Sequence, residues 1–112
     1  MRIEEQRERG VLVLAVMESR LDARVAPEFT RQVGAAVERG ARVIALDLSR
    51  VEFVDSRGLR ALILLFKQIG RSGYLSMAGT RKPVFDLFRM TKLDRSFALF
   101  PTAAIAVAAM NR

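Results

Sequence analysis

The sequence contains no cysteine, no histidine and no tryptophan, and these absences narrow its possible functions. Without cysteine the chain can form neither a disulfide nor a thiolate metal site, which is compatible with a reducing cytosol. Without histidine it lacks the usual general base, the usual zinc ligand and a Ser-His-Asp triad. No apolar run is long enough to span a membrane, and the N-terminus is charged rather than signal-like. We therefore expect a soluble, cytoplasmic protein with no membrane insertion.

Hydrophobic residues make up 51% of the 112 residues, enough for one modest core, so we expect a single domain over residues 1–112. Lysine and arginine outnumber the acids 19 to 12, for a net charge of +7. Such a chain can attract nucleic acid, anionic lipid or an acidic protein. The basic residues are scattered, however, and one tyrosine provides no stacking platform for bases. We predict no specific nucleic-acid binding.

Short apolar runs alternate with amphipathic stretches along the chain. The predicted strands are residues 11–17, 43–48, 74–78 and 98–100, with residues 3–9 as an edge strand or a frayed lead-in. The predicted helices are about residues 26–39, about residues 56–71, a short helix that begins at Pro83, and residues 102–110 with Thr102 as a cap. Ser19 to Asp22 is predicted as a turn. Strands that alternate with helices predict an α/β fold with a mixed, mostly parallel sheet.

The most informative stretch is VEFVDSRGLRALILLF, where a buried run passes into a helix through Asp55 and Ser56. Either residue could simply cap the helix by accepting an N–H bond. One cap is sufficient, so a carboxylate or a hydroxyl would remain free. A phosphate on a free Ser56 would be stabilised at the helix N-terminus, and Arg60, four residues on, could pair with it. Gly58, without a Cβ, would let another protein approach closely.

Two chemical alternatives have weaker support. A nucleophilic-serine enzyme would need a base, and the sequence has neither histidine nor a Gly-x-Ser-x-Gly elbow, so we predict no enzyme activity. Metal binding by Asp22, Asp47 and Asp55 is possible, but these residues lack the spacing of a ligand loop, and we predict no metal site. Asp47 is better explained as a strand-end acid bonded to local backbone.

The segment ALDLSRVEFVDSRGLRALI resembles the central motif of STAS domains, the family named for sulfate transporters and anti-sigma factor antagonists. The matching positions are Asp47-Leu48-Ser49, Phe53, Asp55-Ser56 and Gly58-Leu59. Residues 19–22 and 84–93 resemble flanking family segments, so the resemblance covers nearly the whole chain. It implies a STAS-like fold with four to five strands and about four helices on a mostly parallel sheet.

By this resemblance, the chain would be a bacterial anti-sigma factor antagonist with Ser56 as the phosphoacceptor. The unphosphorylated form would bind an anti-sigma factor that is itself a serine kinase of the histidine-kinase-like ATPase fold, and so release the sigma factor. A Ser/Thr phosphatase would reset phosphorylated Ser56. The kinase would hold ATP and magnesium, so this chain would need no cofactor. The predicted partner-binding residues are Asp22, Asp55, Ser56, Arg57, Gly58 and Arg60.

The chain departs from the family pattern at four positions, all of them basic here: Arg20, Arg57, Arg60 and Lys92. Arg57 and Arg60 stand where small residues are common, Arg20 where glutamate is common and Lys92 where glycine is common. These changes predict a partner with an acidic rim and a salt-sensitive association. The competing interpretation is a structural STAS subunit or adaptor of a membrane transport complex, without phosphorylation.

Overall fold

The computed structural model describes residues 1–111, and its main sheet has five strands in the order β1-β2-β4-β6-β7. β1 pairs antiparallel with β2, and every other neighbouring pair is parallel. The mixed, mostly parallel α/β sheet is therefore confirmed. The bounds of the five strands are β1 (Ile3–Glu8), β2 (Val11–Val16), β4 (Val43–Asp47), β6 (Tyr74–Ala78) and β7 (Ala98–Phe100).

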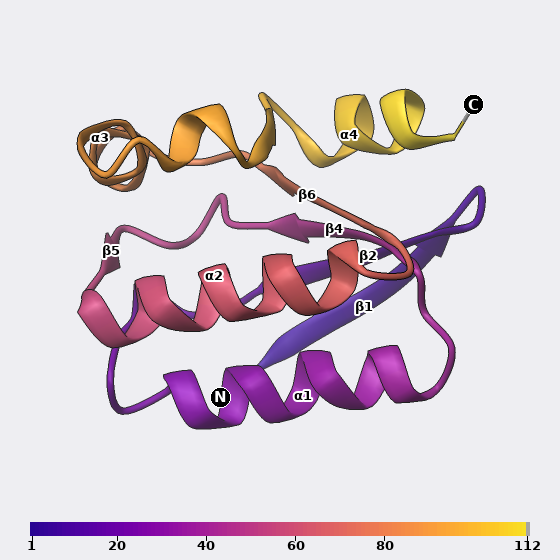
Figure 1. Cartoon of the computed structure of the whole chain (residues 1–112), viewed down its shortest axis with the longest axis horizontal. Helices are drawn as coiled ribbons and strands as arrows, with labels where there is room; N and C mark the ends of the chain where they lie inside the picture. The colour runs from indigo at the N-terminus through magenta and orange to yellow at the C-terminus, as the bar shows by residue number, and fades with distance from the viewer. Residues whose placement is uncertain (112) are drawn as a thin grey trace.

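Two faces of the sheet are covered differently (Figure 1). On one face α1 and α2 lie side by side, and with α3 they enclose the larger core around Phe29, Leu62 and Phe88. On the other face α4 packs through Ala106 and Val107. The helix bounds are α1 (Ala26–Glu38), α2 (Ser56–Gly70), α3 (Lys82–Met90) and α4 (Ala103–Met110), with a 3-10 turn η1 (Leu93–Arg95).

The helices begin within one residue of the predicted positions, and those with a predicted end finish within one residue of it. Pro27 and Pro83 lie in the first turns of α1 and α3, where a missing N–H costs nothing. Gly40 follows α1 with φ of +105°, a backbone conformation that glycine adopts freely. Thr102 caps α4, because its hydroxyl oxygen accepts a hydrogen bond from the N–H of Ile105 at 3.1 Å. Residues 3–8 form an edge strand, which settles the choice left open for that segment.

The predicted turn at residues 19–22 is wrong in part, because a second, two-stranded sheet occupies it. β3 (Arg20–Leu21) pairs in parallel with β5 (Phe53–Val54). Strands of two residues have no periodicity, so the sequence pattern cannot show them. The pairing matters for the site, since the residues that follow β3 and β5 are Asp22 and Asp55.

Candidate functional site

The candidate site lies where β3 and β5 end and α2 begins. The register Leu21 opposite Val54 places Asp22 and Asp55 next to each other, and the N–H of Asp55 donates to the carbonyl of Leu21 at 3.2 Å. Ser56 follows as the first residue of α2. Asp22, more than 30 positions away in the sequence, is thereby brought beside Asp55 and Ser56 at one end of the molecule, the end marked by β5 in Figure 1.

Asp55 is the N-cap of α2, and this settles which of the two polar residues closes the helix. Its Oδ1 accepts a hydrogen bond from the N–H of Gly58 at 2.8 Å, and its Oδ2 accepts one from the N–H of Ala23 at 2.9 Å. These contacts lower the pKa of Asp55, and the hydrogen bond from the N–H of Gly58 is the largest cause. The N–H groups of Ala23 and Arg57 and the charge of Arg57 lower the pKa further, whereas partial desolvation raises it. The carboxylate is therefore ionised and engaged in structure.

The hydroxyl of Ser56 is free, because Asp55 already caps the helix. Ser56 is exposed, and its hydroxyl makes no hydrogen bond to any other group within residues 1–111. It also sits in the first turn of a 15-residue helix, where unpaired N–H groups favour a negative charge. The arrangement can present a hydroxyl to another protein and can accommodate an anion on it.

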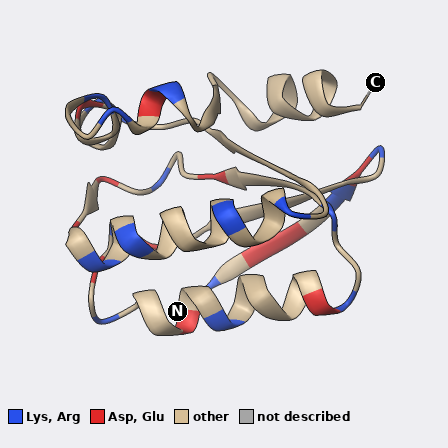
Figure 2. Ribbon diagram, in the orientation of Figure 1, with Lys and Arg blue, Asp and Glu red and all other residues tan. Residues whose placement is uncertain are grey.

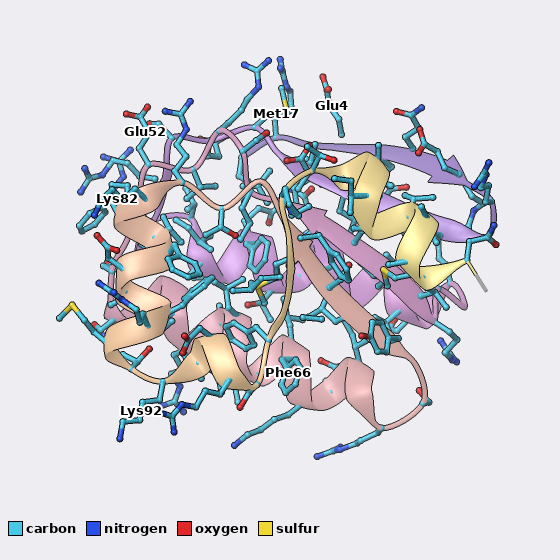
Figure 3. All side chains as sticks on the ribbon, turned by 90° about the horizontal axis from the view of Figure 1, so that it is seen from above. Glu4, Met17, Glu52, Phe66, Lys82 and Lys92 are labelled. Atoms are coloured by element: carbon cyan, nitrogen blue, oxygen red, sulfur yellow. The ribbon has the colours of Figure 1, made fainter. Side chains whose placement is uncertain are left out.

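Asp22 is held in a tight local turn. Its Oδ1 accepts a hydrogen bond from the N–H of Arg24 at 3.1 Å, and its Oδ2 lies 3.3 Å from Nε of Arg20. Arg20 in turn lies over the ring of Phe53, with the guanidinium carbon 4.3 Å from the ring centroid. Sequence reasoning named Arg20 but missed this contact, since only the pairing of β3 with β5 brings Phe53 beside it. In Figure 3, Glu52, just before β5, and Lys82 lie at the same end of the molecule.

The reason proposed for Gly58 is wrong. Gly58 is buried, and a methyl group on its Cα would overlap the carbonyl oxygen of Leu21. The missing Cβ lets the end of β3 approach α2 within the domain rather than admitting a partner. Arg57 and Arg60, by contrast, are exposed. A role of all these residues in partner binding stays a prediction.

Two other expectations concern acidic residues elsewhere. Asp47 bonds to local backbone as expected: its Oδ1 accepts a hydrogen bond from the N–H of Ser49 at 3.0 Å. Within residues 1–111, no group of three or more potential ligand side chains is arranged to hold a metal ion.

In residues 1–111, the part of the chain that the structure describes, no helix combines the length and apolar character needed to cross a bilayer. Figure 2 shows the basic residues spread over helices, strands and loops.

Comparison with known proteins decides the family. The family model described as the STAS domain matches residues 2–106. The chain belongs to the STAS domain family. The anti-sigma-F factor antagonist RsfB of Mycobacterium tuberculosis is 31% identical to this STAS domain over 97 residues, which cover 83% of this chain and 75% of RsfB.

Solved structures agree with this assignment. A crystal structure from Thermotoga maritima, described as a candidate anti-sigma factor antagonist, superposes on this STAS domain with a TM-score of 0.90 and 26% identity, over 98% of this chain and 95% of that one. An anti-sigma factor antagonist from Mycobacterium paratuberculosis gives 0.88 and 28%, over 99% and 94%. The resemblance read from the sequence is confirmed for the family and the fold.

The structure shows why glycine suits one of the positions at which this chain departs from the family pattern. Lys92, where glycine is common, adopts φ of +63° just before η1. This left-handed conformation suits glycine and strains most other residues, so the STAS domain retains here a backbone geometry that its side chain does not favour.

Proposed function

We propose that this chain is a cytoplasmic anti-sigma factor antagonist regulated by phosphorylation of Ser56. Its unphosphorylated form binds an anti-sigma factor that is a serine kinase of the histidine-kinase-like ATPase fold, and this binding releases the sigma factor. The observation that carries the proposal is the exposed hydroxyl of Ser56 beside a neighbour that already caps the helix. The names of the relatives supply the class of partner.

The phosphorylation step uses only the hydroxyl of this chain. The Oγ of Ser56 attacks the γ-phosphorus of ATP, which the kinase holds with magnesium. The Oγ–P bond forms, the bond from that phosphorus to the β,γ-bridging oxygen breaks, and ADP leaves. The hydroxyl proton passes to a base on the kinase. A Ser/Thr phosphatase reverses the modification by hydrolysis, which returns the hydroxyl and inorganic phosphate. The antagonist itself is a regulator and holds neither nucleotide nor metal.

The phosphate changes the charge of the surface without unfolding it. It adds about −1.5 to −2 charges at pH 7 next to the carboxylates of Asp22 and Asp55. These two acids stay anchored by the N–H groups of Ala23, Arg24 and Gly58, so they cannot swing away from the added charge. A partner whose nucleotide phosphates or acids approach this surface is repelled, and the complex dissociates.

The test is affinity capture from the native cell extract with wild-type, Ser56→Ala and Ser56→Asp baits, read by mass spectrometry. We expect wild type and Ser56→Ala to retain a small ATP-binding kinase that Ser56→Asp loses. Ser72→Asp, in the exposed turn that follows α2, is the matched control and should behave as wild type. The purified kinase should then transfer phosphate from ATP to wild type and not to Ser56→Ala.

The competing interpretation predicts a different result in the same experiment. A structural adaptor of a membrane transport complex would retain the same transport subunits on the wild-type and Ser56→Asp baits. Equal retention of a kinase by both baits, or phosphorylation of Ser56→Ala, would also refute the switch. Only loss of the kinase on Ser56→Asp alone supports it.

A further inference from the structure

A groove runs between α1 and α2, beside Ser56, and no family assignment accounts for it. Its volume is about 260 Å³, and Leu64 on its rim is 50% exposed. Single exposed apolar side chains are ordinary, but this one continues into an apolar hollow between two helices. The residues that matter for the argument are Ala23, Pro27, Arg57, Arg60, Ala61 and Leu64.

Two arginines border this groove without an ionic partner. The ion pairs within residues 1–111 engage other arginines, including Arg20, Arg31 and Arg39, and none engages Arg57 or Arg60. The side chain of Arg57 affects Asp55 only through its charge, because that carboxylate accepts its hydrogen bonds from backbone N–H groups. Two exposed guanidinium groups therefore stand free at an apolar hollow, on a chain with a net charge of +7.

The same arginines belong, with Ser56, to the first two turns of α2. Residues four apart share one face of a helix, so Arg60 lies one turn beyond Ser56 in α2. Helical side chains lean toward the N-terminus, which brings the Arg60 side chain back over the first turn. Arg57 follows Ser56 directly. A phosphate on Ser56 and a carboxylate seated in the groove would thus draw on the same two guanidinium groups.

We propose that the groove between α1 and α2 binds a segment of the anti-sigma factor that carries a carboxylate next to an apolar side chain, and that phosphate on Ser56 displaces it by capturing Arg57 and Arg60. The apolar side chain fills the hollow at Leu64, and the carboxylate pairs with the arginines. This inference rests on the proposed function and adds to it the recognition chemistry and the way in which the phosphate acts.

The mechanism differs from simple repulsion in what it requires. Repulsion by the phosphate does not depend on Arg57 or Arg60. If the phosphate acts by capturing Arg57 and Arg60, these arginines are needed for two steps. They first bind the partner, and they then pair with the phosphate when the partner is released. Removing the arginines should therefore weaken the unphosphorylated complex and also raise the second pKa of the phosphate on Ser56.

The first experiment measures binding of the unphosphorylated chain to the purified anti-sigma factor identified by capture. We expect the Arg57→Gln, Arg60→Gln double variant and the Leu64→Gln variant each to bind about tenfold more weakly than wild type, since one good charged or apolar contact is worth a factor of that order. For the double variant, the deficit should shrink at high salt. Lys67→Gln, two turns along the same helix, and Ile105→Gln on α4 should bind as wild type does.

The second experiment needs no partner. Ser56 is replaced by genetically encoded phosphoserine, and the second pKa of the phosphate is followed by phosphorus NMR. We expect this pKa to be depressed in the wild-type background and to rise toward its ordinary value near about 6 in the Arg57→Gln, Arg60→Gln background, whereas Lys67→Gln leaves it unchanged. All these substitutions are at exposed positions, and thermal unfolding checks that each variant is folded.

The outcomes separate this inference from the proposed function. If wild type binds the kinase and the affinities of the groove variants are within twofold of that of wild type, the partner does not bind in the groove. The proposed function still holds in that case. If the phosphate titrates identically with and without the arginines, capture is refuted. If wild type binds no anti-sigma factor, both proposals fail. Weakened binding together with a shifted phosphate pKa supports the inference.

Discussion

The carboxylate of Asp55 joins two segments that lie 32 positions apart in the sequence, because its Oδ2 accepts the N–H of Ala23 at 2.9 Å. The other oxygen of the same carboxylate caps α2 through the N–H of Gly58 at 2.8 Å. One side chain therefore both starts the helix that carries Ser56 and ties it to the segment that leads into α1. The position of Ser56 relative to Asp22 and to the groove between α1 and α2 depends on this tie.

Asp55→Ala should destabilise the protein and loosen the site. The substitution leaves two N–H groups without their acceptor and removes the cap of α2. We expect the melting temperature to fall by roughly 4–8 °C, as for the loss of a helix cap in a domain of this size. Amide hydrogen exchange should speed up most at Ala23 and Gly58.

The matched control for that variant is Glu52→Ala. Glu52 is exposed near the same site, and within residues 1–111 its side chain makes no hydrogen bond or ion pair. Its melting temperature should stay close to that of wild type. An equal fall in both variants would show that the two hydrogen bonds of Asp55 contribute little.

Glu28 should remain ionised far into the acid range. Hydrogen bonds from Arg31, and then from Gln32, lower its pKa to about 2. A depressed pKa in the folded state means that the stabilisation is present above the unfolded value near roughly 4.3 and is lost as the pH falls through about 2. A carbon-detected NMR titration should place the Glu28 midpoint low in wild type and nearer its ordinary value in Arg31→Met.

Arg39→Met controls for the loss of one basic residue. Arg39 pairs with Glu5 at 2.9 Å rather than with Glu28, so its removal should leave the titration of Glu28 unchanged. A midpoint for Glu28 near about 4.3 in wild type would contradict the hydrogen bonds from Arg31 and Gln32.

Gly58→Ala and Gly34→Ala should have opposite effects on stability. Both glycines are in helices, and alanine is the better helix former by about 1 kcal/mol. Nothing lies near a Cβ at Gly34, so Gly34→Ala should stabilise by roughly 0.5–1 kcal/mol. At Gly58 a Cβ would overlap the carbonyl oxygen of Leu21, so Gly58→Ala should destabilise by about 1–3 kcal/mol. Urea denaturation measures both, and stabilisation by Gly58→Ala would contradict the close packing of β3 on α2.

Phe97→Ala should cost about 3–5 kcal/mol of the free energy of unfolding. The ring is buried between two others: its centroid lies 5.2 Å from that of Phe66 and 5.1 Å from that of Phe88, both in edge-to-face geometry. Figure 3 shows Phe66 on α2. Phe85→Ala is the control, since that ring is 39% exposed and its loss should cost much less. Equal effects would mean that the aromatic cluster does not hold α2 and α3 together.

Local signals in the sequence were sufficient for the helices and the main strands. The apolar stripe of α2, the prolines that open α1 and α3, and the cap at Thr102 all act within a few residues, so each is visible in a short window. The buried face of α2 consists of Gly58, Ala61, Leu62, Leu65 and Ile69, which recur at the three- and four-residue spacing of a helix.

Long-range contacts account for what could not be predicted. The pairing of β3 with β5 rests on hydrogen bonds between segments more than 30 positions apart, and two-residue strands have no pattern. Phe97 gave no signal because its burial comes from rings on two other elements. The assignment of the cap to Asp55 rather than Ser56 also required the structure, since both side chains can accept an N–H bond.

By itself the sequence determined the α/β class, the main elements, the STAS motif and the pair Asp55 and Ser56, because periodicity, capping and motif spacing are properties of neighbouring residues. Tertiary structure alone decided that Asp55 is engaged and Ser56 free, that Gly58 serves internal packing, and that Arg57 and Arg60 border a groove beside Ser56. The physical reason is that each of these depends on backbone groups or helices brought together from distant parts of the chain.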